Sequence, residues 1–183
     1  MMLATRAVCR LLRGSHATSQ VRALSTASEE RFLGFSRGVF IHIAEEACPF
    51  IGKMLEPKVT QLSAGELVME LPFKEDFIGN PVNGVLHGGV TAALIDHVGG
   101  FCAMSSVPDA NFLLSTVDLR IDYLSPAPPE ALVCHAWVTS RKKTLVRSDI
   151  ECWNADRTVK IASGRALYSL YPSKIQLGDI ENK

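Results

Sequence analysis

Two adjacent glycines, Gly88 and Gly89, stand where a loop rich in Gly, Asn and Pro passes into a helical pattern. The first N–H groups of a helix have no partner inside it, and the helix dipole adds partial positive charge at that end. Because glycine has no side chain, a ligand can approach this backbone closely. A carbonyl oxygen placed there would be polarised, and an oxyanion forming on it would be stabilised. The alternative is a glycine-rich helix start that serves tight packing alone.

A single carboxylate, Asp96, interrupts a helical segment that is otherwise apolar almost all round. Burying an isolated carboxylate costs several kcal/mol unless it is paired or reached by water. Asp96 therefore lies either in a solvated cleft or in a functional site. His97 beside it could be a partner, although adjacent positions on a helix point in different directions.

The spacing of these groups along the helix adds a constraint. Asp96 follows His87 by nine residues, which corresponds to about 13 Å along a helix axis and about half a turn around it. One helix cannot direct both ends of that span at a single bond. If both residues act on one substrate, they come from different copies of the chain. The spacing thus predicts a homo-oligomer with shared active sites.

The elements that must position these groups are one helix and a run of strands. The segment from Gly89 to about Ser105 has no polar face, and a helix of this kind is buried on most sides. Alternation and turn residues predict strands at 59–62, 66–71, 115–123, 131–141, 144–153 and 158–171. A helix followed by antiparallel strands indicates an α+β fold, with an antiparallel β-sheet wrapped around one long central helix.

The strand at 115–123 shows the clearest alternation. The pattern places Val117, Leu119, Ile121 and Tyr123 on one face, and Thr116, Asp118, Arg120 and Asp122 on the other. Upstream, residues 29–57 are predicted to be an N-terminal helical segment, helical from Phe32 to Leu55 with Pro49 as an interruption. Residues 58–175 then form the single domain, and 176–183 form a C-terminal tail.

The first 28 residues differ in kind from the rest. They contain Arg6, Arg10, Arg13 and Arg22, four serines and no acidic residue. An Arg-rich, Ser-rich and acid-poor segment is typical of a mitochondrial transit peptide. The sequence at 22–25, Arg-Ala-Leu-Ser, also resembles a matrix-peptidase cleavage site. We therefore expect a location in the mitochondrial matrix, with a disordered basic tail as the alternative.

Composition excludes several classes of function. The 183 residues carry 19 basic and 19 acidic side chains, which gives no general affinity for nucleic acid. No apolar run approaches the roughly 20 residues that span a bilayer, so stable membrane insertion is not expected. The five cysteines show no zinc-ligand spacing, so they are interpreted as reduced, mostly buried thiols. Neither a metal nor a redox cofactor is expected.

Taken together, these residues resemble the PaaI-type branch of the hotdog-fold acyl-CoA thioesterases. The resemblance rests on Gly84-Val85-Leu86-His87-Gly88-Gly89 with an acidic residue nine positions after the histidine, and it continues through residues 115–127. It covers roughly residues 60–170 and implies hydrolysis of acyl-CoA to a free acid and CoA. Hotdog relatives with this motif usually form a dimer of dimers, which implies a homotetramer.

The resemblance also implies roles for individual residues. Asp96 would activate water as the general base, or attack as the nucleophile itself. The N–H of Gly88 would polarise the thioester carbonyl, and His87 would shape that turn and contact the carbonyl or the thiolate. Thr116 occupies a position where the family often carries a small hydroxyl residue near the lytic water.

A side-chain amide is expected upstream of the histidine, and here the sequence departs from the family. The usual position, six residues before His87, is occupied by Pro81, with Asn80 and Asn83 on either side. A one-residue shift in the loop would restore Asn80, which we prefer, and Asn83 remains the alternative.

Substrate binding is expected to involve a basic cluster as well as the loop. Arg141, Lys142 and Lys143 are the most compact group of cations in the predicted domain and are plausible contacts for the phosphates of CoA. A solvated turn between two strands is the competing interpretation. The remaining expected substrate-binding residues are Asn83, Gly89 and Tyr123.

Two other functions are compatible with parts of the pattern. A hotdog enoyl-CoA hydratase would carry D-x-N-P-x-H within one short loop, but Ile78 stands where the Asp is needed and no His follows Asn80-Pro81 closely. A non-catalytic acyl-CoA-binding sensor would keep the pocket without turnover. Asp96 argues against a sensor, because binding alone does not need it.

Overall fold

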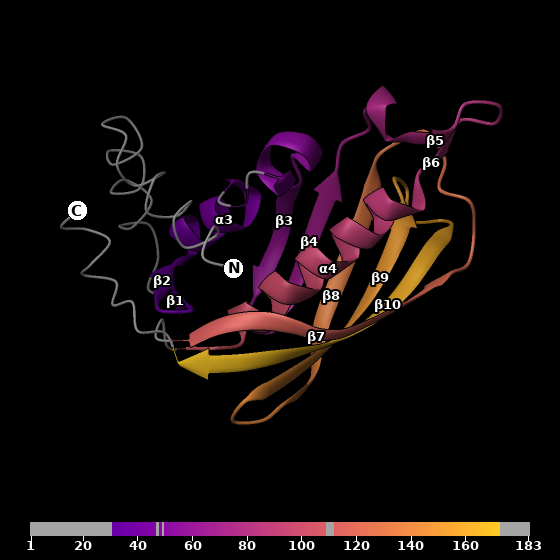
Figure 1. Ribbon diagram of the computed structural model, residues 1–183. Coiled ribbons are helices and arrows are strands. Elements are labelled where there is room, and N and C mark those ends of the chain that lie inside the picture. The colour runs from indigo at the N-terminus through magenta and orange to yellow at the C-terminus, as the bar shows by residue number, and fades with distance from the viewer. Residues whose placement is uncertain (1–30, 47, 49, 109–111, 173–183) are drawn as a thin grey trace.

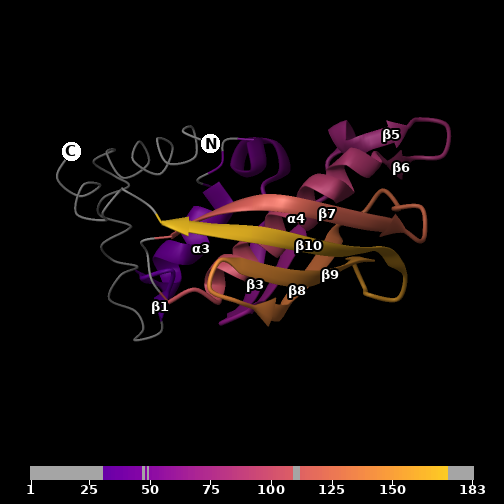
Figure 2. The same ribbon diagram turned by 60° about the horizontal axis from the view of Figure 1, so that its bottom comes forward.

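The computed structural model describes residues 31–46, 48, 50–108 and 112–172 (Figure 1). The predicted transit segment at 1–28 and the predicted tail at 176–183 lie outside the described residues. One long helix, α4 (Gly88–Ser105), lies across one face of a curved sheet, as Figures 1 and 2 show from two directions. The predicted α+β class, with a sheet wrapped around a central helix, is confirmed.

The sheet has six antiparallel strands in the order β3-β4-β8-β9-β10-β7. Their bounds are β3 (Lys58–Ser63), β4 (Glu66–Leu71), β7 (Phe112–Tyr123), β8 (Leu132–Arg141), β9 (Leu145–Asn154) and β10 (Lys160–Pro172). All six predicted strands are present, each with bounds close to those expected. Because β7 follows α4 in the chain but pairs with β10, it forms one edge of the sheet, and β3 forms the other.

The helix α4 packs against this sheet with apolar side chains. Leu94, Ile95 and Val98 are fully buried beneath it, as expected for a helix without a polar face. Gly164 on β10 allows the close approach, because a Cβ there would lie 2.6 Å from Ile95 Cγ2. Glycine at this point therefore sets how near the helix comes to the sheet.

The edge strand β7 contains one irregularity. Opposite β10, Asp118 pairs with Leu167 and Thr116 pairs with Tyr168, so Val117 is an extra residue in β7. A bulge of this kind changes which face the following side chains occupy. Thr116 consequently faces α4, whereas strict alternation had placed it with Asp118 on the opposite face. The alternation predicted for 115–123 is wrong at this residue.

The N-terminal segment is not a continuous helix from Phe32. It begins with a small hairpin, β1 (Arg31–Phe32) and β2 (Phe35–Ser36), because Leu33 and Gly34 take positive φ angles of 49° and 76° and reverse the chain. The helix α3 (Arg37–Glu46) follows, and then a π-helical turn at Ile51–Leu55. The hydrophobic spacing marked α3 correctly but could not reveal the hairpin before it.

The helix α3 packs against α4 through an aromatic cluster and one hydrogen bond. Phe40 meets Phe101 edge to ring, with centroids 5.7 Å apart. His97 donates from Nε2 to the carbonyl oxygen of Ala44 over 2.7 Å. His97 therefore faces α3 and has a structural contact of its own there.

Three of the five cysteines, Cys102, Cys134 and Cys152, are buried free thiols in this core, and the half-buried Cys48 is also free. Burial raises the pKa of Cys102 to about 12, so this thiol stays protonated. The expectation of reduced, mostly buried thiols is met for these four, and Cys9 lies outside the described residues. No helix among the described residues is long and apolar enough to cross a membrane.

Stability should depend on pH through His97. Burial lowers the pKa of His97 from 6.5 to about 4, against the opposing effect of its bond to Ala44. Between these values the unfolded chain binds a proton that the folded chain does not, so stability falls as pH falls from about 6.5 and stops falling below about 4. The lost free energy of unfolding is about 3 kcal/mol. Urea titrations between about pH 6.5 and pH 4 should show this His97-dependent loss of free energy of unfolding in wild type and not in His97→Gln.

Gln keeps a donor for the Ala44 carbonyl, so the variant tests the charge rather than the hydrogen bond. The two proteins share every other titrating group, and only the difference between their curves is used. If the free energies of unfolding of the two proteins change in parallel from pH 7 to pH 4, His97 does not titrate in this way.

Candidate active site

The start of α4 is fixed by hydrogen bonds that converge on His87. Its N–H donates to the carbonyl of Phe77 over 2.8 Å, and its own carbonyl accepts from Val90 N–H over 2.9 Å. The Gly89 N–H donates to His87 Nδ1 over 2.9 Å, which makes His87 the N-cap. Because Nδ1 accepts this bond, the ring proton is on Nε2. The exposed Nε2–H is then free to donate to a ligand.

Close packing against a hairpin holds this turn in place. The hairpin of β5 (Ile78–Asn80) and β6 (Val85–Leu86) lies against it, since a Cβ at Gly79 would lie 2.6 Å from His87 Cα. Of the two glycines, Gly89 already uses its N–H on His87. Gly88 is the first helical residue, and none of the hydrogen bonds found in the described residues uses its N–H. Gly88 therefore supplies the backbone donor that a substrate oxygen could reach.

Tyr123, at the end of β7, also contacts this turn. Its hydroxyl donates to the Gly88 carbonyl over 2.9 Å. The ring lies over the glycine, since a Cβ at Gly88 would be 3.4 Å from Tyr123 Cε1. The structure thus places this expected substrate-binding residue against the backbone of Gly88.

Asp96 lies two turns further along α4 and points toward β7. Its Oδ1 accepts a hydrogen bond of 3.0 Å from Thr116 Oγ1, which the bulge at Val117 makes possible. The residue is only partly buried, and no ion pair to it is found among the described residues. Its backbone carbonyl accepts from the Tyr168 hydroxyl over 3.2 Å. Asp96 is therefore held by one neutral donor and remains open to water.

The β5–β6 hairpin holds both candidate amides at the surface, Asn80 at the end of β5 and Asn83 in the loop that follows. Asn80 Oδ1 accepts from Val82 N–H over 3.0 Å, and Asn83 Oδ1 accepts from Val85 N–H over 3.2 Å. Each side chain thus stabilises the loop with its oxygen, and its NH₂ group points outward with no partner among the described residues. Both remain candidates for the amide of the site.

Arg141, Lys142 and Lys143 lie at the turn between β8 and β9, as expected. All three are exposed, and no acidic partner is found for them in the described part of the chain. The turn lies beside the end of β10, where Leu170 N–H donates to the Thr144 carbonyl and Leu170 pairs with Leu114 of β7. It is therefore at the opposite end of β7 from Tyr123 and Gly88.

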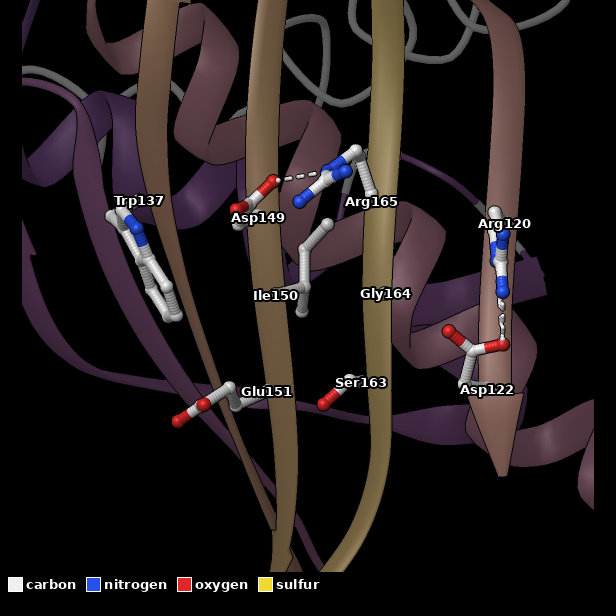
Figure 3. A pocket seen from close by; sticks show the side chains of 9 residues that line it. All are labelled: Arg120, Asp122, Trp137, Asp149, Ile150, Glu151, Ser163, Gly164 and Arg165. Carbon is white, nitrogen blue, oxygen red and sulfur yellow. Dashed lines mark hydrogen bonds and ion pairs between the residues drawn. The ribbon is translucent and has the colours of Figure 1, made fainter. Parts of the chain in front are cut away.

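A pocket of about 420 Å³ lies on the other face of the sheet, away from Asp96 and Gly88 (Figure 3). Its charged side chains bind one another: Arg165 pairs with Asp149 and Arg120 pairs with Asp122. Glu151 at its edge pairs with Lys160. Each charged side chain that lines the pocket therefore has an ion-pair partner of opposite charge. Its lining residues are Arg120, Asp122, Trp137, Asp149, Ile150, Glu151, Ser163, Gly164 and Arg165.

The same segment that carries this geometry matches known proteins. A sequence model of the thioesterase superfamily matches residues 83–161. Over 120 residues the chain is 33% identical to acyl-coenzyme A thioesterase 13 of Mus musculus, a match that covers 64% of this chain and 82% of the mouse protein. The chain belongs to the thioesterase superfamily.

Further proteins resemble this chain in sequence or in fold. A putative esterase of Saccharolobus solfataricus is 36% identical over 106 residues, covering 58% of this chain and 73% of that protein. A solved thioesterase family protein from Silicibacter pomeroyi superposes with a TM-score of 0.66 at 20% identity, covering 73% of this chain and 97% of its own. The Escherichia coli PaaI protein superposes with a TM-score of 0.59 at 21% identity, covering 68% of this chain and 86% of its own. Structures this distant show the fold, which is the expected hotdog fold.

Within this superfamily member, the predicted residues fall into two groups. His87, Gly88, Gly89 and Tyr123 meet at the start of α4, beside the loop with Asn80 and Asn83. Asp96 and Thr116 meet at the middle of α4. Sequence reasoning missed Tyr168, because a tyrosine in the alternating pattern of β10 gives no sign that its hydroxyl reaches a helix carbonyl.

Proposed function

We propose that this member of the thioesterase superfamily hydrolyses acyl-CoA thioesters in the mitochondrial matrix, as a homo-oligomer with active sites shared between subunits. Thioester hydrolysis follows from the family, and relatives named acyl-CoA thioesterase support acyl-CoA as the substrate class. The observation that carries the proposal is a pair of groups on α4. Among the described residues, the Asp96 carboxylate has only a neutral hydroxyl as its partner, and the Gly88 N–H at the start of the helix has no acceptor.

In the proposed reaction, the thioester carbonyl oxygen accepts a hydrogen bond from Gly88 N–H and is further polarised by the helix dipole. Asp96 removes a proton as water attacks the carbonyl carbon, or attacks that carbon itself to form an anhydride that water then cleaves. The C–S bond breaks, and the CoA thiolate leaves and takes up a proton. His87 Nε2–H is placed to donate to the carbonyl or to the departing sulfur. Thr116 keeps Asp96 oriented while its own oxygen can accept from the water.

The edge position of β7 supports the shared site. Within the described sheet, β7 pairs with β10 on one side only, and an edge strand is a ready surface for strand pairing. A two-fold axis through the middle of Thr116–Tyr123 would pair β7 with a second copy's β7 in antiparallel orientation. Thr116 would then face Tyr123 of the second copy. Since Thr116 holds Asp96 and Tyr123 contacts Gly88, Asp96 of one chain would meet Gly88 of the other.

The same arrangement gives the basic turn a role. Arg141, Lys142 and Lys143 lie at the end of the sheet to which the axis would bring the second copy's Gly88. A thioester bound there could extend its CoA phosphates toward these three cations, for which the described residues provide no acidic partner. Without residues 1–24, the chain would hold 15 basic and 19 acidic side chains, so a polyanion needs a local cluster of this kind.

Replacing the carboxylate should abolish turnover. In Asp96→Asn, kcat for acyl-CoA hydrolysis should fall by about a thousandfold, because an amide can neither accept a proton nor attack. CoA release from a panel of short, long and aromatic acyl-CoAs would measure this. Mixing Asp96→Asn chains with His87→Ala chains and refolding them together should restore about a quarter of wild-type activity, since half of random dimers would carry one intact site.

Each variant refolded alone is the control for this recovery. Activity that stays at the level of the separate variants would show that each site is built from a single chain. A wild-type chain that binds acyl-CoA but hydrolyses no ester in the panel would instead be a sensor.

The basic turn should act on the nucleotide part of the substrate alone. Replacing Arg141, Lys142 and Lys143 together by Ala should raise KM for acyl-CoA by about tenfold, with kcat little changed. KM for the matching acyl-pantetheine, which lacks the nucleotide phosphates, should stay the same. Lys58→Ala, on the far edge strand β3, removes an equivalent surface cation that pairs with Glu45 and serves as the control. An equal rise in KM for both substrates would rule out phosphate binding by this turn.

The matrix location rests on the composition of residues 1–28. The full chain should be imported by isolated mitochondria, become protected from external protease and lose a segment that ends near residue 24. A chain with Arg6, Arg10 and Arg13 changed to Glu should remain outside. Protease-sensitive wild-type chain would contradict the proposed location while leaving the proposed chemistry standing.

A further inference from the structure

Two tyrosine hydroxyls donate to backbone carbonyls of α4, and they do so at the two residues to which the proposed chemistry assigns direct roles. Tyr123, from β7, donates to the Gly88 carbonyl over 2.9 Å. Tyr168, from β10, donates to the Asp96 carbonyl over 3.2 Å. Helix carbonyls already accept from the N–H four residues later, so each phenol adds a second donor that ties the helix to a strand.

Tyr168 reaches Asp96 along a path that two glycines leave open. Its side chain is fully buried, and a Cβ at Gly99 would lie 2.5 Å from its hydroxyl oxygen. A Cβ at Gly100 would lie 3.6 Å from its ring. Burial, with Asp96 and Cys102 as further causes, raises the pKa of Tyr168 far above its ordinary value. The phenol therefore stays protonated and remains a donor.

Tyr123 differs in a way that favours a positional role. More than half of its side chain, 54%, is exposed, so its hydroxyl could bond to water instead. Burial does not force it onto the Gly88 carbonyl. Contact between its ring and the glycine, together with this bond, holds the first turn of α4 against the end of β7.

The two-fold arrangement makes the axial position of α4 critical. In such a dimer the two helices run antiparallel, so a slide of each helix along its own sheet moves Gly88 of one chain and Asp96 of the other in opposite directions. The offset between them changes by twice the slide. A misplacement of about 1 Å can cost about a hundredfold in rate. Contacts that fix α4 along its axis therefore act directly on the geometry of the site.

We propose that Tyr123 and Tyr168 are positioning residues. They fix Gly88 and Asp96 by tying α4 to the edge strand β7 and to its neighbour β10. This inference rests on the proposed shared thioesterase site. Each phenol donates to a backbone carbonyl of α4, so both act through the helix.

The test is removal of each hydroxyl alone. In Tyr123→Phe and Tyr168→Phe, kcat for an acyl-CoA that wild type hydrolyses should fall by about tenfold each, with KM within about twofold of wild type. In the double variant, kcat should fall by at least the product of the two effects, because both bonds oppose the same displacement. Leu62→Val, a core change on β3, lowers stability without touching α4 carbonyls and serves as the control for loss of stability alone.

Amide hydrogen exchange provides a measurement that does not depend on activity. Tyr123→Phe should speed exchange in the first turns of α4 by about tenfold while the middle of β9 is unchanged, whereas Leu62→Val should speed both together. If the Phe variants keep the wild-type kcat, or if only their KM changes, the positioning role is wrong and the thioesterase proposal is unaffected. A wild-type chain without thioesterase activity would contradict both proposals. If Tyr168→Phe does not fold, the Tyr123→Phe variant tests the positioning role by itself, because Tyr123 is exposed.

Discussion

The distance between Gly88 and Asp96, about 12 Å along one helix, is the constraint on which the rest of the site depends. A helix cannot fold back to bring its own residues together, so each group needs separate support. His87, Gly79 and Tyr123 hold the first turn, and Thr116 and Tyr168 hold the region of Asp96. Most of these supports come from the sheet or from the β5–β6 hairpin. The geometry of the proposed site is therefore set by how the helix lies on the sheet.

The surroundings of Asp96 are suited to a base. Its side chain has the Thr116 hydroxyl as its one hydrogen-bond partner among the described residues, and no arginine or lysine pairs with it there. Full burial would cost several kcal/mol, and partial exposure avoids that cost. A carboxylate oriented by a neutral donor and left open on one side keeps its access to water.

The sequence predicted most of the fold because the relevant signals are local. The helix from Gly88 to Ser105 has no polar face, and the strands alternate, so both could be recognised from spacing alone. The hairpin at 31–36 was missed because it depends on two positive φ angles, one of them at Leu33, which composition does not mark. Asp96, Gly88 and His87 stood out because their residue types are unusual in such places. Tyr168 did not, because its role depends on Gly99, which is 69 residues earlier in the chain and adjacent only after folding.

The bulge at Val117 shows how closely the strand and the helix are matched. Thr116 and Tyr123 are seven positions apart, and an odd separation in a regular strand puts two side chains on opposite faces. With Val117 unpaired in the ladder, both residues face α4, one at Asp96 and the other at Gly88. Without the extra residue, one of the two contacts would be lost to the opposite face of the sheet. Bulges are common at sheet edges, and β7 has a single neighbour in the described sheet. The edge that can pair with a second copy is thus the strand that can accommodate the bulge, and the same 12 residues serve both ends of the helix.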